Sequence, residues 1–257
     1  MRKIITNSQQ ATIDNTENYN MSSKYRQIPT AEVIQRFNQQ GFKLESFQEA
    51  RYRKADKVNK IRHVVQMSID QDDRVRRQVT IMNASDGSSS LRLHFSYHVF
   101  ACANGIICAD DIIPSTRIRH STQDPFTIID NFIETMKSKL DEEKAIRESM
   151  YTKILSQYDI SEFARKAIAI REKDITRVLD YNAVSIVQRP ADLGKTLFAV
   201  YQRIQENLLD GNFRKQGIIT NDEGKTIEVY KNAKRITSIT ENARINIALS
   251  NLALDYL

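Results

Sequence analysis

The sequence is poor in cysteine and has no long hydrophobic run. Its two cysteines, Cys102 and Cys108, are too few for the disulfide framework of a small secreted protein, and a zinc site would need further ligands at suitable spacing. We expect both to be buried, reduced thiols. No run of about 18 apolar residues occurs, and the basic start, residues 1–7, lacks the apolar region of a signal peptide. We therefore expect no membrane association and a reducing cytoplasm.

Signatures of common catalytic sites are missing as well. The segment LGKT ends at Thr196, but a phosphate-binding loop needs a glycine five positions before Gly194, where Arg189 stands. There is no HExxH pattern, no serine nucleophile elbow and no cysteine with an evident base. We predict that the protein is not an enzyme and uses no cofactor and no metal. A minor alternative is a metal-dependent nuclease that uses His94, His98 and Asp86.

Composition indicates a folded chain with an acidic partner. The 257 residues suffice for one large domain or two modest ones, and 40% hydrophobic with 27% charged residues is ordinary for a globular protein. The net charge of +6 favours a polyanionic partner. We place nucleic acid first among such partners.

The middle of the chain predicts a sheet. In residues 78–109 two apolar, β-branched and aromatic runs flank a turn rich in Asn, Asp, Gly and Ser, and the second run ends at an Asn-Gly pair. Upstream, residues 42–52, 61–69 and 74–82 carry strand-like spacing. We predict three or four consecutive antiparallel strands, and thus an α+β fold: a central antiparallel β-meander packed by a long helix and further C-terminal helices.

Helical periodicity surrounds this sheet. Thr30 is a suitable N-cap for a helix over 31–40, and Asp124 followed by Pro125 opens a helix of 25 residues or more. Ser161 begins the next helix. Further helices are expected over 195–209 and 236–254, with a loop or hairpin over 212–231. The expected organisation is a flexible leader (1–23), a sheet core with the long helix (24–160) and a mainly helical C-terminal region (161–257).

Basic residues on the predicted meander form the most informative set. Strand alternation places Arg74 with Arg76, and Arg92 with His94, on shared faces. Cations for phosphates and exposed rings for bases are what single-strand binding requires. The predicted nucleic-acid-binding residues are Arg51, Arg53, Lys54, Lys57, Lys60, Arg62, Arg74, Arg76, Arg77 and Arg92, with Tyr52 and Tyr97 as stacking rings. The alternative is a solvated polar face with the aromatic rings in the core.

The turn between the two central runs allows two interpretations. Residues 83–88, NASDGS, could bind a cation or a phosphate through backbone amides. Alternatively, the side chains of this hairpin loop satisfy its own backbone.

Four segments resemble landmarks of the phage/plasmid-like protein family, a domain of unknown function common in phages and mobile elements. They are YRQIPT (25–30), NASDGSS (83–89), VFACANG (99–105) and QENLLDG (205–211). The chain departs from the family at Ala84-Ser85, where a Ser-His pair is usual, and at Ala101, where a branched residue is common. The resemblance covers most of the chain and supplies no chemistry.

The predicted order of elements also resembles single-strand annealing proteins, which use a helix, a short meander and a long helix and assemble into rings or arcs around one DNA strand. Residues 31–40, 42–109 and the helix from Pro125 would play these parts. The resemblance implies a homo-oligomeric, non-catalytic single-stranded DNA-binding protein of a phage or mobile element, in the host cytoplasm. The alternative is a phage accessory protein that binds a host defence protein through its basic face.

Overall fold

The computed structural model describes residues 6–15, 21–49, 62–100, 105–220 and 226–257. The chain divides into two compact units, Met1–Asp141 and Glu142–Leu257. The sequence had placed the end of the sheet-containing part at residue 160. None of the helices in the described ranges is long and apolar enough to cross a bilayer.

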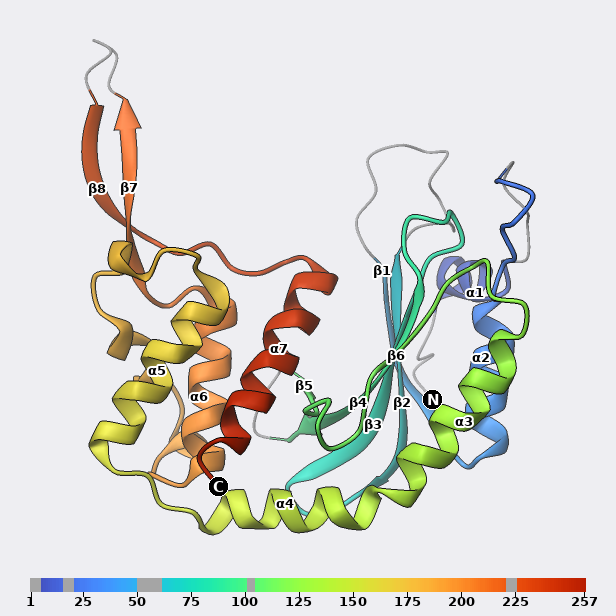
Figure 1. The fold of residues 1–257 in the computed structure, drawn as a ribbon, viewed down its shortest axis with the longest axis horizontal. Coiled ribbons are helices and arrows are strands. Elements are labelled where there is room, and N and C mark those ends of the chain that lie inside the picture. The colour runs from blue at the N-terminus through green and yellow to red at the C-terminus, as the bar shows by residue number, and fades with distance from the viewer. Residues whose placement is uncertain (1–5, 16–20, 50–61, 101–104, 221–225) are drawn as a thin grey trace. The chain divides into compact units, whose positions relative to one another are not determined.

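Unit 1 is built on the predicted antiparallel meander (Figure 1). Its strands are β1 (Lys43–Glu49), β2 (His63–Gln71), β3 (Val75–Asn83), β4 (Leu91–Val99), β5 (Ile106–Ile107) and β6 (Thr116–Ile118). The first four strands pair in chain order, and both β5 and β6 pair with β4. The α+β prediction and the central meander are therefore confirmed.

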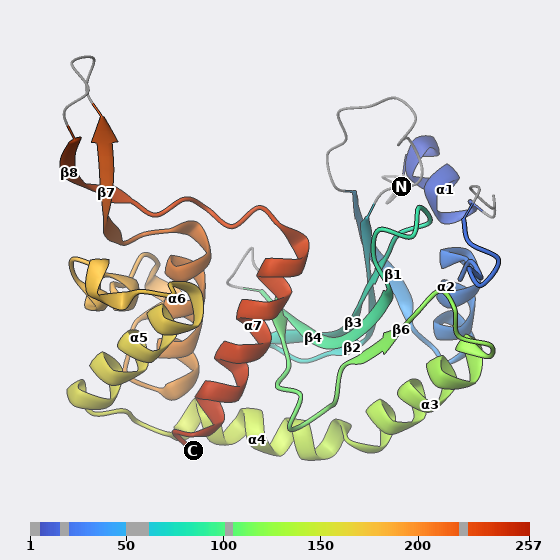
Figure 2. The same cartoon turned by 45° about the horizontal axis from the view of Figure 1, so that its top comes forward.

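One face of this sheet is the hydrophobic core of unit 1. Val65, Ile81 and Leu93 occupy one row across β2, β3 and β4, and all three are fully buried. Helices α2 (Thr30–Gln39) and α3 (Pro125–Ser138) lie side by side next to the sheet (Figures 1 and 2). Phe37 of α2 contacts Phe132 of α3, with 6.5 Å between ring centroids. Amphipathic helices thus close the apolar face.

The helix boundaries show where local signals were sufficient. Asp124 is the N-cap of α3, as predicted, because its carboxylate accepts a hydrogen bond from the Thr127 amide at 3.1 Å. The prediction for Thr30 was wrong: Thr30 is the first helical residue, after Pro29 at the cap, and its buried hydroxyl lies 2.8 Å from His63 Nε2. A further helix, α1 (Asn7–Ile13), lies within the stretch that we expected to be a flexible leader.

The predicted helix of 25 or more residues is two helices. α3 ends at Ser138, and α4 (Leu140–Thr152) follows after Lys139. No proline or glycine occurs at this break, and the helical spacing of apolar residues continues across it, so the sequence predicts one helix. The Lys139 side chain donates from Nζ to the Ile112 carbonyl oxygen at 2.8 Å, which ties the break to the loop after β5.

Unit 2 is mainly helical and carries a two-stranded ribbon (Figure 1). Its elements after α4 are α5 (Gln157–Arg171), the 3₁₀ turns η2 (Ile175–Arg177), η3 (Tyr181–Ser185) and η4 (Pro190–Asp192), α6 (Leu197–Asp210), β7 (Arg214–Thr220), β8 (Thr226–Asn232) and α7 (Ile239–Leu254). α5 begins after Ser156, whose hydroxyl accepts from the Asp159 amide at 3.1 Å, and not at Ser161 as predicted. The hairpin prediction for residues 212–231 is confirmed as β7 and β8.

Gly211 fixes the geometry between α6 and the ribbon. Its φ of +80° ends α6 in the left-handed conformation. A Cβ atom at this position would lie 2.3 Å from the Ala233 carbonyl oxygen, at the end of β8. Glycine is therefore required where the helix end and the base of the ribbon approach each other.

Candidate nucleic-acid interface

The second face of the unit 1 sheet is polar. The β3–β4 register pairs Arg76 with His98, Gln78 with Ser96, Thr80 with His94, and Met82 with Arg92. Side chains directly opposite each other in an antiparallel pair share a face. Arg92 and His94 therefore lie on one face, as strand alternation predicted. We call it the polar face; the residues in its middle, Gln78, Thr80, His94 and Ser96, are buried.

One end of the polar face is neutralised by an internal ion pair. Arg76 Nη1 lies 2.6 Å from Glu45 Oε2, and the Ser68 hydroxyl donates to the other oxygen of the same carboxylate at 2.5 Å. Arg77, on the opposite face, donates from Nε to Asp70 Oδ1 at 2.7 Å. Carboxylates of the protein thus already bind these two guanidinium groups, and the phosphate-binding roles of Arg76 and Arg77 stay predictions.

The other end carries three arginines close together. Strand β6 places Arg117 directly opposite Arg92, and Arg62 immediately precedes β2. Burial lowers the pKa of Arg92, and the positive charges of Arg117 and Arg62 lower it further. The Arg92 Nε atom is buried and has no hydrogen-bond partner in the described part of the chain. We call Arg62, Arg92 and Arg117 the arginine cluster.

Within the described part of the chain, Arg62 and Arg117 of this cluster donate hydrogen bonds to neutral oxygen atoms. Arg62 Nη2 donates to the Ser88 carbonyl oxygen at 3.0 Å, and Arg117 Nε donates to the Ser90 hydroxyl at 3.1 Å. None of the ion pairs found among the described residues involves the cluster. Positive charge is thus concentrated at one end of the polar face, where an anion would relieve the mutual repulsion.

A pocket of about 270 Å³ adjoins the cluster. Its basic and hydroxyl-bearing lining residues are Ser22, Lys24, Tyr25, Ser89, Ser90, Arg117, Arg119, His120 and Ser121. The His120 ring stacks on Tyr25 with centroids 5.1 Å apart. Burial lowers the pKa of His120, while the backbone carbonyls of Arg26 and Ser89 act in the opposite direction. Because Lys24 and Arg119 also line this pocket, the basic surface extends beyond the polar face.

The turn between β3 and β4 satisfies its own backbone. Asn83 Oδ1 accepts from the Ala84 amide at 2.9 Å, and Asp86 Oδ1 accepts from the Ser88 amide at 3.0 Å. Gly87 supplies the positive φ of +68° that the turn requires. Of the two sequence interpretations, the self-satisfied hairpin loop is the one observed. The loop nevertheless holds Ser88 and Ser90 against the arginine cluster.

The remaining predicted site residues divide into two groups. Tyr97 is 6% exposed, and its hydroxyl lies 3.4 Å from Cys108 Sγ, so its ring belongs to the core and the predicted stacking role is wrong. Arg74 is exposed in the turn between β2 and β3. Arg51, Tyr52, Arg53, Lys54, Lys57 and Lys60 lie outside the described residues, as does Cys102; Cys108 is a buried thiol.

The sequence prediction omitted Lys24, Arg117 and Arg119. The strand that aligns Arg117 with Arg92 is only three residues long, too short for a periodic signal. The sequence shows three basic residues grouped within 117–120, but it does not show that this segment pairs with β4.

The histidines of the polar face are engaged in the fold. His94 Nδ1 lies 2.6 Å from the Ser115 hydroxyl, and burial, assisted by Arg92 and opposed by Asp110, lowers the pKa of His94 to about 4. Within the described ranges, no three His, Cys, Asp or Glu side chains are grouped so as to hold a metal ion.

Comparison with known proteins identifies a family and two similar proteins. The family model described as a domain of unknown function (DUF932) matches residues 20–244. The UPF0380 protein YafZ of Escherichia coli (strain K12) is 22% identical over 192 residues, 74% of this chain and 70% of the relative. The UPF0380 protein YfjQ of the same organism is 23% identical over 193 residues, with the same coverage. No solved structure matches the chain significantly.

Proposed function

The chain belongs to the DUF932 family, and from the geometry of its arginine cluster we propose that it is a non-catalytic protein of a phage or mobile element that binds and anneals single-stranded DNA. One observation carries the proposal: Arg62, Arg92 and Arg117 converge at one end of the polar face, where Arg62 and Arg117 donate hydrogen bonds to neutral oxygens. The four landmark segments described above support the phage or mobile-element origin.

Phosphate is the anion that suits this cluster. A guanidinium group presents several N–H donors in a plane and binds phosphate oxygens in pairs. Arg92 is partly exposed, so a phosphate bound against it would offset the mutual repulsion of the three positive charges. Lys24 and Arg119 line the adjoining pocket and would extend the contact to a neighbouring phosphate.

The order of elements in unit 1 supports a single strand over a duplex. Single-strand annealing proteins use a helix, an antiparallel meander and a following helix. In unit 1, α2, β1 to β4 and α3 occur in the same order. This support is an analogy of architecture. Strand preference is therefore measured directly in the experiment below.

The test is a titration of labelled single- and double-stranded oligonucleotides of equal length at several salt concentrations, with the wild-type protein and the R92A/R117A variant. Losing two phosphate contacts should make the slope of log K against log salt shallower by about 1.4 for a single strand. R165A/R244A is the control, because it removes the same charge from two arginines of unit 2 that pair with Glu162 and Glu241.

Two results would overturn the proposal. If the wild-type protein binds neither oligonucleotide at low salt, nucleic acid is not its partner, and a pull-down from nuclease-treated host lysate would test the alternative of a host protein. If R92A/R117A and R165A/R244A change the slope equally, net charge alone explains binding, and the arginine cluster is not the contact site.

A further inference from the structure

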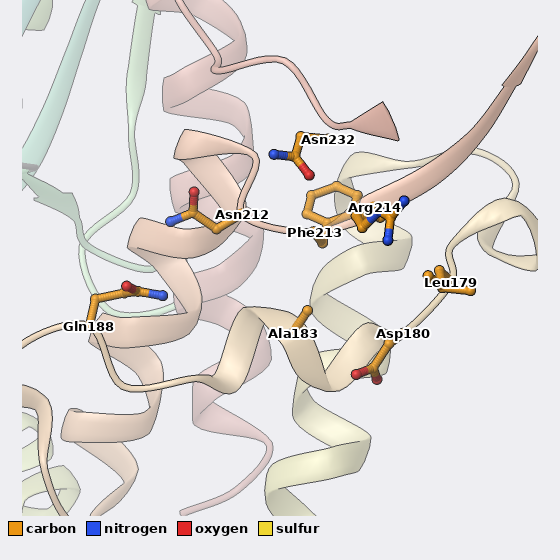
Figure 3. Close-up of a pocket in the computed structure, with 8 residues that line it drawn as sticks. All are labelled: Leu179, Asp180, Ala183, Gln188, Asn212, Phe213, Arg214 and Asn232. Carbon is orange, nitrogen blue, oxygen red and sulfur yellow. The ribbon is translucent and has the colours of Figure 1, made fainter. Parts of the chain in front are cut away.

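Unit 2 contains a hollow of about 480 Å³ at the base of the β7–β8 ribbon (Figure 3). It lies between the segment that contains η3, the turn after α6 and the first residues of the ribbon. This volume falls in the range of about 300 to 1,000 Å³ that is usual for small-molecule sites. We call it the ribbon hollow.

The lining of the ribbon hollow is rich in side-chain amides. Gln188, Asn212 and Asn232 each bring a carboxamide, Arg214 brings a guanidinium group, and Asp180 brings a carboxylate, which accepts from the Asn182 amide at 2.9 Å (Figure 3). A carboxamide offers a donor and an acceptor side by side, which matches the donor and acceptor pattern along the edge of a nucleobase. The Asn212 amide nitrogen is already fixed, because it donates to Asn207 Oδ1 at 2.8 Å, and this bond leaves the Asn212 carbonyl oxygen as an acceptor.

The frame of the hollow is held in place by buried groups. Asn207 is fully buried, and its Nδ2 atom donates to the carbonyl oxygens of Val184 and Ile186 at 3.0 and 2.8 Å, which fastens the η3 segment to α6. Phe213 is 1% exposed, and the Arg171 guanidinium lies 5.0 Å from its ring centroid. A site on such a fixed frame loses little conformational entropy when a ligand binds.

The ribbon continues the hollow with an exposed aromatic ring. The register pairs Arg214 with Asn232 and Gln216 with Tyr230, so Tyr230 lies on the same ribbon face as the two residues that line the hollow. Tyr230 is 46% exposed. An isolated two-stranded ribbon is only marginally stable in water, and here its base is secured by the hydrogen bond from the Leu179 amide to the Arg214 carbonyl oxygen at 2.9 Å.

We infer that the ribbon hollow and Tyr230 form a base-binding subsite for two successive nucleotides of the DNA strand. The amides of Asn212 and Asn232 bond the edge of one base, Arg214 binds its phosphate, and the Tyr230 ring stacks on the next base. This inference rests on the proposed function and assigns to unit 2 a contact that is distinct from the arginine cluster of unit 1.

The experiment compares the variants Y230A, Y230F and I227A of the full chain in binding a single-stranded oligonucleotide. Stacking on one ring is lost in Y230A and kept in Y230F, so Y230A should bind about ten-fold more weakly while Y230F equals the wild type. The slope of log K against log salt should stay unchanged, because no phosphate contact is removed. Ile227 is a matched control, since it is equally exposed, at 46%, but lies on the other ribbon face.

Base recognition by the amides is tested by comparing the affinities for oligonucleotides of different bases. The wild type should distinguish oligo-dT, oligo-dA and oligo-dC, and N212A/N232A should reduce the differences between them. Melting curves of each variant would verify that it is folded.

The outcomes separate this subsite from the proposed function. If Y230A binds as tightly as the wild type while R92A/R117A binds weakly, the subsite is wrong and the proposed function stands. Equal losses in Y230A and I227A would also overturn the subsite, because stacking would not explain them. If the wild-type protein binds no oligonucleotide, both proposals fall.

Discussion

At one end of the polar face Arg76 pairs with the carboxylate of Glu45, whereas at the other end Arg92 lies opposite Arg117, another positively charged residue. Both arginines lie on paired strands of the same sheet, and both are only partly exposed. The Arg76 charge is satisfied within the protein, while the Arg92 charge is opposed by its neighbours, which lower its pKa. What makes an arginine available to an external anion is therefore its surroundings more than its position on a strand.

His94 sharpens this comparison, because it lies between the two ends on β4 and its pKa of about 4 is below the ordinary value of 6.5. The unfolded chain binds more protons between these two values, so the contribution to stability is present above pH 6.5 and is lost as the pH falls towards 4. The loss should be about 3 kcal/mol for this group. Urea unfolding of wild type and H94Q at a series of pH values measures it.

The variant H94Q is the appropriate comparison because glutamine can still bond the Ser115 hydroxyl. Its free energy of unfolding should vary less between pH 6.5 and 4 than that of the wild type. Parallel pH profiles for the two proteins would show that folding does not lower the pKa of His94.

The variant S90D would give the arginine cluster a carboxylate partner, as Arg76 has at the other end of the polar face. Arg117 Nε lies 3.1 Å from the Ser90 hydroxyl, so an aspartate at this position would pair with Arg117 much as Glu45 pairs with Arg76. Affinity for a single-stranded oligonucleotide should fall about ten-fold at low salt, because the new carboxylate competes with phosphate. S90N has nearly the same shape without the charge, and equal binding by S90D and S90N would argue against a phosphate at Arg117.

The smallest effect is expected from the converse change, E45Q. The variant removes the carboxylate that neutralises Arg76 while it keeps an acceptor for the Ser68 hydroxyl. Oligonucleotide affinity should rise about two- to three-fold at low salt and return to the wild-type value at high salt. Stability should fall by at most about 1 kcal/mol, since both side chains are partly exposed, at 30% and 28%. A wild-type affinity at every salt concentration would show that Arg76 remains out of reach.

Much of the fold could be predicted because its signals are local. Alternation identified the strands of the meander, Asp124 was read correctly as a helix cap, and the two glycines within 212–231 marked the hairpin. Errors arose where tertiary contacts decide: the Thr30 hydroxyl is engaged by His63, and α3 ends at Ser138 without a breaking residue.

The candidate site could be predicted only in part, because pairing between distant residues is not visible in the sequence. A bulge in β1 shifts the register between Leu44 and Ser46, and it lets Glu45 and Ser46 both bond partners on the polar face. Strict alternation places these two neighbours on opposite faces, so the neutralisation of Arg76 could not be foreseen. Alternation also does not show which face of the sheet is covered by helices. Tyr97 was therefore predicted to be an exposed stacking ring, whereas it is buried in the core.

The order of strand pairing in unit 1 has a consequence for how this unit folds. The β3–β4 hairpin closes a loop of residues 84–90, whereas the contact of Phe37 with Phe132 joins positions 95 residues apart. Closing the longer loop costs about 2 kcal/mol more in chain entropy. Each hairpin of the meander can form before the next is made, and every pair shortens the remaining search. We therefore expect α3 to pack on α2 late in folding, after the sheet has formed.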